Sequence, residues 1–206
     1  MKILKYISKS ILLFIIGILL IVSCSKSEPE PVKPVAIKSP ITYFEETFYN
    51  LYLSKTGFDQ TAVNTIDLAN NELGLEFTPI VNGKMTKIFV KLPVVNNNLR
   101  VTVWDKAAGT KLTTETVIVD RAEVRITKDI DDLTLVKDRV YAITMNTNDW
   151  INRKRTDGGA ATYPITIGNL KINGYKYTPG TTAVYPTTVN NTVYSGDIYF
   201  NFLQTE

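Results

Sequence analysis

The sequence predicts an all-β protein whose main domain is an antiparallel β-sandwich of the jelly-roll type, with an up-and-down barrel as the competing architecture. After residue 70, apolar and polar residues alternate almost throughout, which is the pattern of strands with one buried and one solvated face. Residues that favour turns separate these segments, and Thr, Val, Ile and Tyr are abundant within them. No segment of this region keeps a helical period for more than about two turns.

The alternating segments place an apolar residue at every second position, which predicts the buried face of each strand. These residues are Leu73, Leu75 and Phe77; Ile88, Val90 and Leu92; Leu99, Val101 and Val103; Tyr141, Ile143 and Met145; and Ile198, Phe200 and Phe202. Turn formers lie between them at 81–83, 96–98, 108–110, 173–174 and 179–180. The stretch 42–70 fits either a short helix or a strand, because Phe44, Phe48, Leu51 and Leu53 suit both patterns.

Composition excludes several classes of chemistry. The 206 residues contain no histidine, which excludes Ser-His-Asp and Cys-His catalysis and any imidazole metal ligand. A single cysteine excludes an intramolecular disulfide and a cysteine-rich zinc site. The net charge of +3 comes from three lysines in residues 1–23, which hold no acid, so 20 basic and 20 acidic residues remain in the rest of the chain. A nucleic-acid partner is therefore not expected.

The N-terminus predicts an export signal at 1–23. Three lysines precede twelve uncharged apolar residues at 11–22, which is shorter than the roughly twenty that span a bilayer. The sequence Ile-Val-Ser-Cys that ends at Cys24 resembles the lipobox of bacterial lipoproteins. That resemblance implies cleavage before Cys24, a thioether-linked diacylglycerol on its sulfur and an acylated amine, which together make a stable membrane anchor. The alternative is an uncleaved signal anchor with an inert Cys24.

The segment 24–41 predicts a spacer between the anchor and the domain at 42–206. Four of the nine prolines fall here, at Pro29, Pro31, Pro34 and Pro40, and favour an extended chain. The residue directly after Cys24 is Ser25 and not an aspartate, and the stretch 25–30, with Glu28 and Glu30, loosely resembles the export signal of Bacteroidota lipoproteins. We expect a cell-envelope protein of the outer membrane, with exposure at the cell surface as a further hypothesis.

A series of short motifs occurs in order along the last two thirds of the chain. They are 72–77 (ELGLEF), 82–88 (NGKMTKI), 101–105 (VTVWD), 109–112 (GTKL), 132–135 (DLTL), 139–143 (RVYAI) and 185–187 (YPT). Together they resemble the bacterial domain of unknown function 4082 family over residues 72–206. The resemblance implies a galactose-binding-like sandwich that acts as a non-catalytic module, and it supplies no site residues. The chain departs from the family pattern at 89–92 (FVKL) and in lacking an adjoining enzyme domain.

The stretch 146–155 predicts a binding loop after a strand. It carries Trp150 beside Asn148, Asp149 and Asn152, and sugar sites combine a flat aromatic ring with amides and acids that bind hydroxyl groups. The alternative is an ordinary connection with Trp150 packed at the core edge. Trp104 is a second candidate, as an exposed platform if its face of the strand is wet and as core if that face is covered.

Acidic residues offer two further kinds of candidate site. The acids at 129–132 suit a Ca²⁺ ion by their chemistry, but a solvated turn is the better interpretation, so neither a metal nor a cofactor is expected. Glycoside hydrolysis needs two facing carboxylates about 5–10 Å apart, and no motif marks such a pair.

The sequence thus predicts a lipid-anchored envelope protein whose non-catalytic module binds a glycan. A structural or adhesion subunit that docks envelope proteins is the alternative, and a hydrolase is the third hypothesis.

Overall fold

The computed structural model describes residues 42–205, which belong to one compact unit. The predictions for the signal at 1–23, Cys24 and the spacer lie outside the described residues. The described chain contains one helix and twelve strands. They are β1 (Glu45–Thr47), α2 (Tyr49–Thr56), β2 (Thr61–Pro79), β3 (Gly83–Lys91), β4 (Asn96–Asp105), β5 (Thr110–Val119), β6 (Ile126–Leu135), β7 (Tyr141–Lys154), β8 (Ile165–Ile167), β9 (Leu170–Pro179), β10 (Thr188–Val189), β11 (Val193–Ser195) and β12 (Asp197–Gln204).

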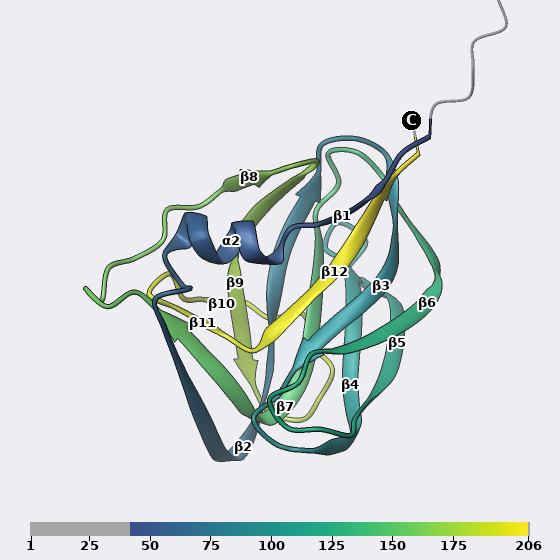
Figure 1. Cartoon of the computed structure of the whole chain (residues 1–206). Helices are drawn as coiled ribbons and strands as arrows, with labels where there is room; N and C mark the ends of the chain where they lie inside the picture. The colour runs from purple at the N-terminus through teal and green to yellow at the C-terminus, as the bar shows by residue number, and fades with distance from the viewer. Residues whose placement is uncertain (1–41, 206) are drawn as a thin grey trace, which may run out of the picture. The chain divides into compact units, whose positions relative to one another are not determined.

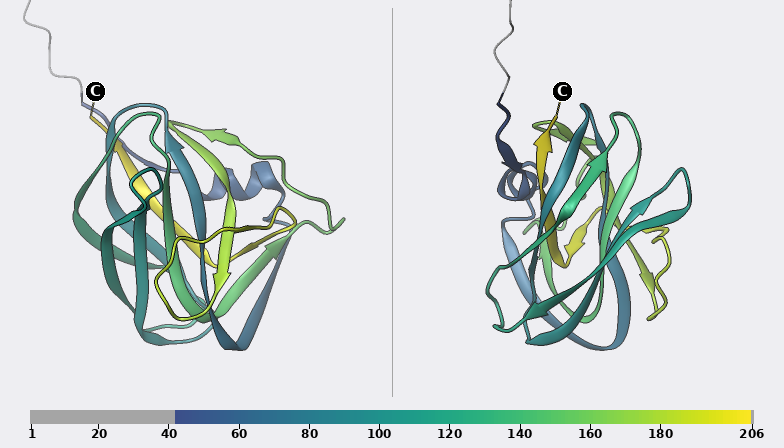
Figure 2. Two further views of the ribbon diagram at one scale, coloured as in Figure 1. Left: turned by 180° about the vertical axis from the view of Figure 1, so that it is seen from behind. Right: turned by 90° about the vertical axis from the view of Figure 1, so that its right-hand side faces the viewer.

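The strands form two antiparallel sheets that face each other as a sandwich (Figure 1; Figure 2). The first sheet has the order β1-β12-β3-β6. The second has the order β10-β9-β2-β7-β4-β5, with β11 paired to β7 and β8 paired to β9. The predicted all-β sandwich is confirmed, and the barrel alternative is wrong because two separate sheets form. Among residues 42–205, no helix has the length and apolar character needed to cross a membrane.

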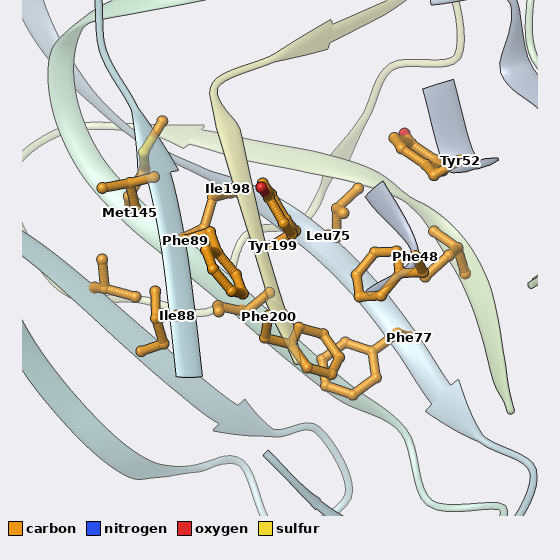
Figure 3. Packing of buried hydrophobic residues seen from close by; sticks show 14 of the residues in the cluster. Phe48, Tyr52, Leu75, Phe77, Ile88, Phe89, Met145, Ile198, Tyr199 and Phe200 are labelled. Atoms are coloured by element: carbon orange, nitrogen blue, oxygen red, sulfur yellow. The ribbon is translucent and has the colours of Figure 1, made fainter. Parts of the chain in front are cut away.

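The core lies between the sheets and is built from the residues that the two-residue period selects. The fifteen apolar residues predicted to face inward are all at most 2% exposed. Aromatic rings from both sheets meet in the middle, with the Phe77 and Phe200 centroids 4.5 Å apart (Figure 3). Phe48 adds a third ring from the chain before α2, 5.0 Å from Phe200. Burial of this apolar surface supplies the main favourable free energy of folding.

The stretch 42–70 contains both a helix and a strand. Helix α2 is capped at its C-terminus by Gly57, which has a φ of +74°. This conformation lets the backbone N–H of Gly57 donate to the Ser54 carbonyl and that of Phe58 donate to the Leu53 carbonyl. Tyr52 and Leu53 face the core, and the Tyr52 hydroxyl lies 2.7 Å from that of Tyr163. Four residues separate the helix from strand β2. Of the four apolar residues that suited both patterns, Leu51 and Leu53 belong to α2, Phe48 directly precedes it and Phe44 precedes β1.

Candidate functional site

Strand β7 carries the predicted binding residues, and here the predicted loop is wrong. Residues 146–154 continue β7 instead of leaving the sheet, because the first part of β2 pairs with them up to Thr61 opposite Lys154. Trp150 lies opposite Thr65 within this ladder. Side chains that were expected on a free loop therefore have positions fixed by backbone hydrogen bonds.

The pairing of β2 with β7 is interrupted by a bulge at 67–70. The ladder passes from Ile66 opposite Asp149 directly to Asn71 opposite Thr147. Side chains of β7 hold the bulge in place. The Asn148 amide donates to the carbonyl oxygen of Asp67 at 2.9 Å, and a carboxylate oxygen of Asp149 accepts the backbone N–H of Asp67 at 3.3 Å. Asn148 and Asp149 thus support the backbone of β2 and do not line the pocket described next.

A pocket of about 220 Å³ lies at this end of the second sheet. Its described lining residues are Asn71 and Leu73 of β2, Trp150 and Asn152 of β7, Tyr175 and Tyr177 of β9, Asn190, and Ser195 of β11. Two of the predicted residues, Trp150 and Asn152, therefore come together with six that were not predicted as site residues. Four separate chain segments converge here because β2 pairs with β7 on one side and with β9 on the other.

Asn152 is the hydrogen-bonding centre of the pocket wall. Its side-chain oxygen accepts the indole N–H of Trp150 at 3.0 Å and the hydroxyl of Ser195 at 2.5 Å. Its amide donates to the Thr65 hydroxyl at 2.6 Å. These bonds fix the plane of the Trp150 ring and satisfy its only polar atom. Trp150 therefore offers apolar surface to the pocket, and Asn152 positions it.

Two tyrosines of β9 form the aromatic side of the pocket. The rings of Tyr175 and Tyr177 are nearly parallel, at 14°, with centroids 6.3 Å apart. Tyr175 is 2% exposed, and burial raises the pKa of its hydroxyl above the ordinary value. Tyr177 is only partly buried, and its hydroxyl has no hydrogen-bond partner among the described residues. Tyr177 is thus the aromatic ring of the pocket that solvent reaches.

Two asparagines leave polar atoms free at the pocket. The amide of Asn71 donates to the Ala69 carbonyl at 3.2 Å, which leaves its side-chain oxygen without a partner among the described residues. The side-chain oxygen of Asn190 accepts the N–H and hydroxyl of Thr192, at 2.9 and 3.0 Å, and its amide has no partner in the same part of the chain. The pocket therefore offers one free acceptor, one free donor and one hydroxyl beside aromatic surface.

Trp104 does not contribute to this pocket. It is 4% exposed, and its indole N–H donates to the Thr144 hydroxyl at 2.8 Å. The Tyr185 ring meets it edge-on at 6.2 Å, from the segment between β9 and β10. This segment covers the outer face of the sheet, so Trp104 is packed beneath it and is not an exposed platform.

The same outer face buries two carboxylates that sequence reasoning did not single out. Glu72 accepts hydrogen bonds from Arg100 at 2.7 Å and from Thr144 at 2.5 Å. Glu76 is bound by Lys176 at 2.6 Å and by Tyr185 at 2.5 Å. The two acids stand four residues apart on β2, or about 13 Å along an extended strand.

The acids at 129–132 lie within strand β6, so the predicted turn is wrong. Asp129 is paired with Lys87 of β3, residues 130–132 lie where the register with β3 shifts, and Lys84 forms an ion pair with Asp132 at 3.0 Å. No cluster of three or more potential metal ligands is found in residues 42–205.

Two arginines at the end of β7 and just after it, Arg153 and Arg155, form separate ion pairs. The Arg153 side chain is 14% exposed and pairs with Asp197, whereas Arg155 pairs with Asp157 nearer the surface. Each arginine thus has its own acidic partner.

Tyrosine enrichment was the sequence signal for two of the six missed residues, Tyr175 and Tyr177. Five tyrosines fall between 163 and 194, but only the pairing of β9 with β2 shows which of them share a pocket with Trp150. The resemblance over 72–206 offers no help in this choice, because it carries no site residues. Searches against family models, curated proteins and solved structures find no match to this chain.

Proposed function

We propose that this protein is a lipid-anchored component of the cell envelope and that its sandwich, of the jelly-roll and galactose-binding-like type, is a non-catalytic glycan-binding module. The observation that carries the proposal is the pocket beside Trp150, where aromatic rings and free amide groups converge. Tyr177 supplies a ring that solvent reaches, and Asn71 and Asn190 supply an acceptor and a donor. Apolar walls with a few convergent polar groups are typical of small-molecule sites.

The chemistry of the pocket matches that of a sugar ring. A pyranose has one face of C–H groups, which packs against an aromatic ring, and a rim of hydroxyl groups that both donate and accept hydrogen bonds. The Tyr177 ring suits the first, and Asn71 and Asn190 suit the second. Because drug-sized sites occupy roughly 300–1,000 Å³, a pocket of about 220 Å³ fits one sugar residue better than a longer segment of chain.

A glycan array tests this function with two variants. Tyr177→Ala removes the accessible ring of the pocket, and binding is expected to fall to background. Phe44→Ala is the matched control, because Phe44 is an aromatic residue that is 83% exposed and does not line the pocket. Trp150→Ala is less suitable, since loss of a buried tryptophan typically costs about 3–5 kcal/mol of stability. An array on which the unaltered chain binds nothing would remove the proposal.

The anchor is tested separately from the pocket. If Cys24 carries acyl chains, the chain remains with the membrane fraction and incorporates labelled fatty acid, and Cys24→Ser does neither. Protease treatment of intact cells then distinguishes the faces of the outer membrane. Digestion of the domain supports exposure at the cell surface, and full protection contradicts it.

A structural or adhesion role is the second candidate, and the edge strands favour it. Strand β5 ends the second sheet and β6 ends the first, each with ten residues. The outer edge of β5 presents a row of backbone groups, and Ile118 on this strand is 60% exposed. Such edges can receive a strand from a partner. Recovery of one stoichiometric partner from solubilised membranes, lost in Ile118→Lys, would favour this role.

A further inference from the structure

The pocket beside Trp150 differs from the rest of the protein surface in its charge. All eight described lining residues are uncharged: one tryptophan, two tyrosines, three asparagines, a leucine and a serine. We infer that the pocket selects an uncharged sugar residue and rejects sugars that carry a carboxylate or an ammonium group. This inference rests on the proposed glycan-binding function and names the class of ligand.

The charged residues next to the lining residues in sequence point away from the pocket. Glu72 stands between Asn71 and Leu73, and Lys176 stands between Tyr175 and Tyr177. Because side chains alternate along a strand, both lie on the outer face of the sheet. Their partners confirm this, since Glu72 pairs with Arg100 at 2.7 Å and Lys176 pairs with Glu76 at 2.6 Å.

Two charged residues beside the lining residues remain, both on β7. Asp149 precedes Trp150, and its carboxylate accepts the backbone N–H of Asp67 at 3.3 Å. The other is Arg153, which follows Asn152. Its guanidinium is already occupied. It donates two hydrogen bonds to the carboxylate of Asp197, at 2.5 and 2.7 Å, in a pair that is almost entirely buried. To bind an anionic ligand it would have to abandon a buried carboxylate, which is strongly unfavourable. The lining residues thus include no cation, and the cations next to them in sequence are held in ion pairs.

The free groups of the pocket suit hydroxyl groups instead. A sugar hydroxyl can donate a hydrogen bond to the side-chain oxygen of Asn71 and accept one from the amide of Asn190. It can also donate to the Tyr177 hydroxyl or accept from it. A carboxylate at the same place finds no cation, and the Asn71 oxygen repels it. It would lose hydration without a compensating ion pair, and this cost lowers its affinity.

Matched sugar pairs test this inference, because a hexose and its hexuronic acid differ only at carbon 6. The full chain is purified in a zwitterionic detergent that contains no sugar, and titration calorimetry compares glucose, galactose and mannose with their uronic acids at pH 7. The hexose that binds most tightly is expected to exceed its uronic acid by about tenfold or more. N-acetylglucosamine should likewise exceed glucosamine. The hexose affinity should not change with salt, since no ion pair forms.

A variant that adds one charge sharpens the result. Asn190→Asp keeps an oxygen that can accept from Thr192 and replaces the amide with a carboxylate oxygen. The hexose affinity should fall, because a donor is lost, and the uronic acid affinity should fall further. A uronic acid that binds as tightly as its hexose would overturn the inference and leave glycan binding intact. If neither member of any pair binds, the inference and the proposed function both fail for these sugars.

Discussion

Arg153 of β7 and Asp197 of β12 form a bidentate ion pair that joins the two sheets of the sandwich. Their side chains are 14% and 1% exposed, and Arg153 makes bonds of 2.5 and 2.7 Å to the two carboxylate oxygens. Burial acts to lower the pKa of Arg153, but the hydrogen bonds and charge of Asp197 outweigh it and keep that pKa above its ordinary value.

Loss of one partner in this pair should destabilise the fold strongly. Asp197→Asn leaves the Arg153 guanidinium buried without its anion, and we expect the free energy of unfolding to fall by about 3–5 kcal/mol. Urea unfolding followed by tryptophan fluorescence measures the change. Asp157→Asn is the control, since its pair with Arg155 is exposed, and its urea midpoint should hardly move. Equal decreases in the urea midpoint of the two variants would show that the buried Arg153 pair contributes no more to the free energy of unfolding than the exposed pair.

Glu76 should make the fold sensitive to acid. Its burial acts to raise its pKa, but hydrogen bonds from Lys176, Tyr185 and Lys106 together bring it below the ordinary value of 4.5. A group with a lowered folded-state pKa contributes stability above its unfolded-state pKa and loses that contribution as the pH falls through the folded-state value. The urea concentration at the midpoint of unfolding should therefore decrease as the pH is lowered below about 4.5. This decrease should be smaller in Glu76→Gln than in the unaltered chain. Parallel curves for both proteins would contradict this role of Glu76.

Asn148→Ala should reduce stability without abolishing ligand binding. Its amide bonds the Asp67 carbonyl at 2.9 Å in the bulge and does not line the pocket. Loss of one such bond costs about 1 kcal/mol, which urea unfolding can measure. Binding that disappears in Asn148→Ala while the fold persists would instead place this residue in the ligand site.

The two tryptophans should report ligand binding differently. Trp150 lines the pocket, whereas Trp104 lies beneath Tyr185 on the outer face. A bound sugar should therefore change the emission of a Trp104→Phe variant, whose remaining indole is in the pocket. The reciprocal Trp150→Phe variant should show no ligand-dependent change. The opposite pattern would move the binding site to the outer face of the second sheet.

The strands were predictable from the sequence because one strong signal determines them. Leu73, Leu75 and Phe77 alternate with residues of the outer face, and burial of one face leaves only one register for such a strand. The polar residues at 146–154 lack this signal. They remain in a strand because β2 pairs with them across the bulge, and that partner lies about eighty residues away in sequence.

The site was only partly predictable for the same reason. Trp150 and Asn152 stood out by residue type, but so did Asn148, which faces the bulge instead of the pocket. A bulge changes which side of the sheet the following residues face, and a local pattern does not reveal it. Whether Trp104 is exposed or buried depended on whether another segment covers its face of the sheet. Tyr185, 81 residues further along the chain, provides that cover.

The measurement that tests glycan binding at this pocket most directly is the dissociation constant of the most tightly bound sugar for Tyr177→Ala and Phe44→Ala, measured side by side by titration calorimetry. Tyr177 is the accessible ring of the pocket, and Phe44 is an exposed ring outside it. We expect Tyr177→Ala to weaken binding by about tenfold or more and Phe44→Ala to leave it unchanged. An unchanged dissociation constant in Tyr177→Ala would show that sugars, if bound at all, are held elsewhere.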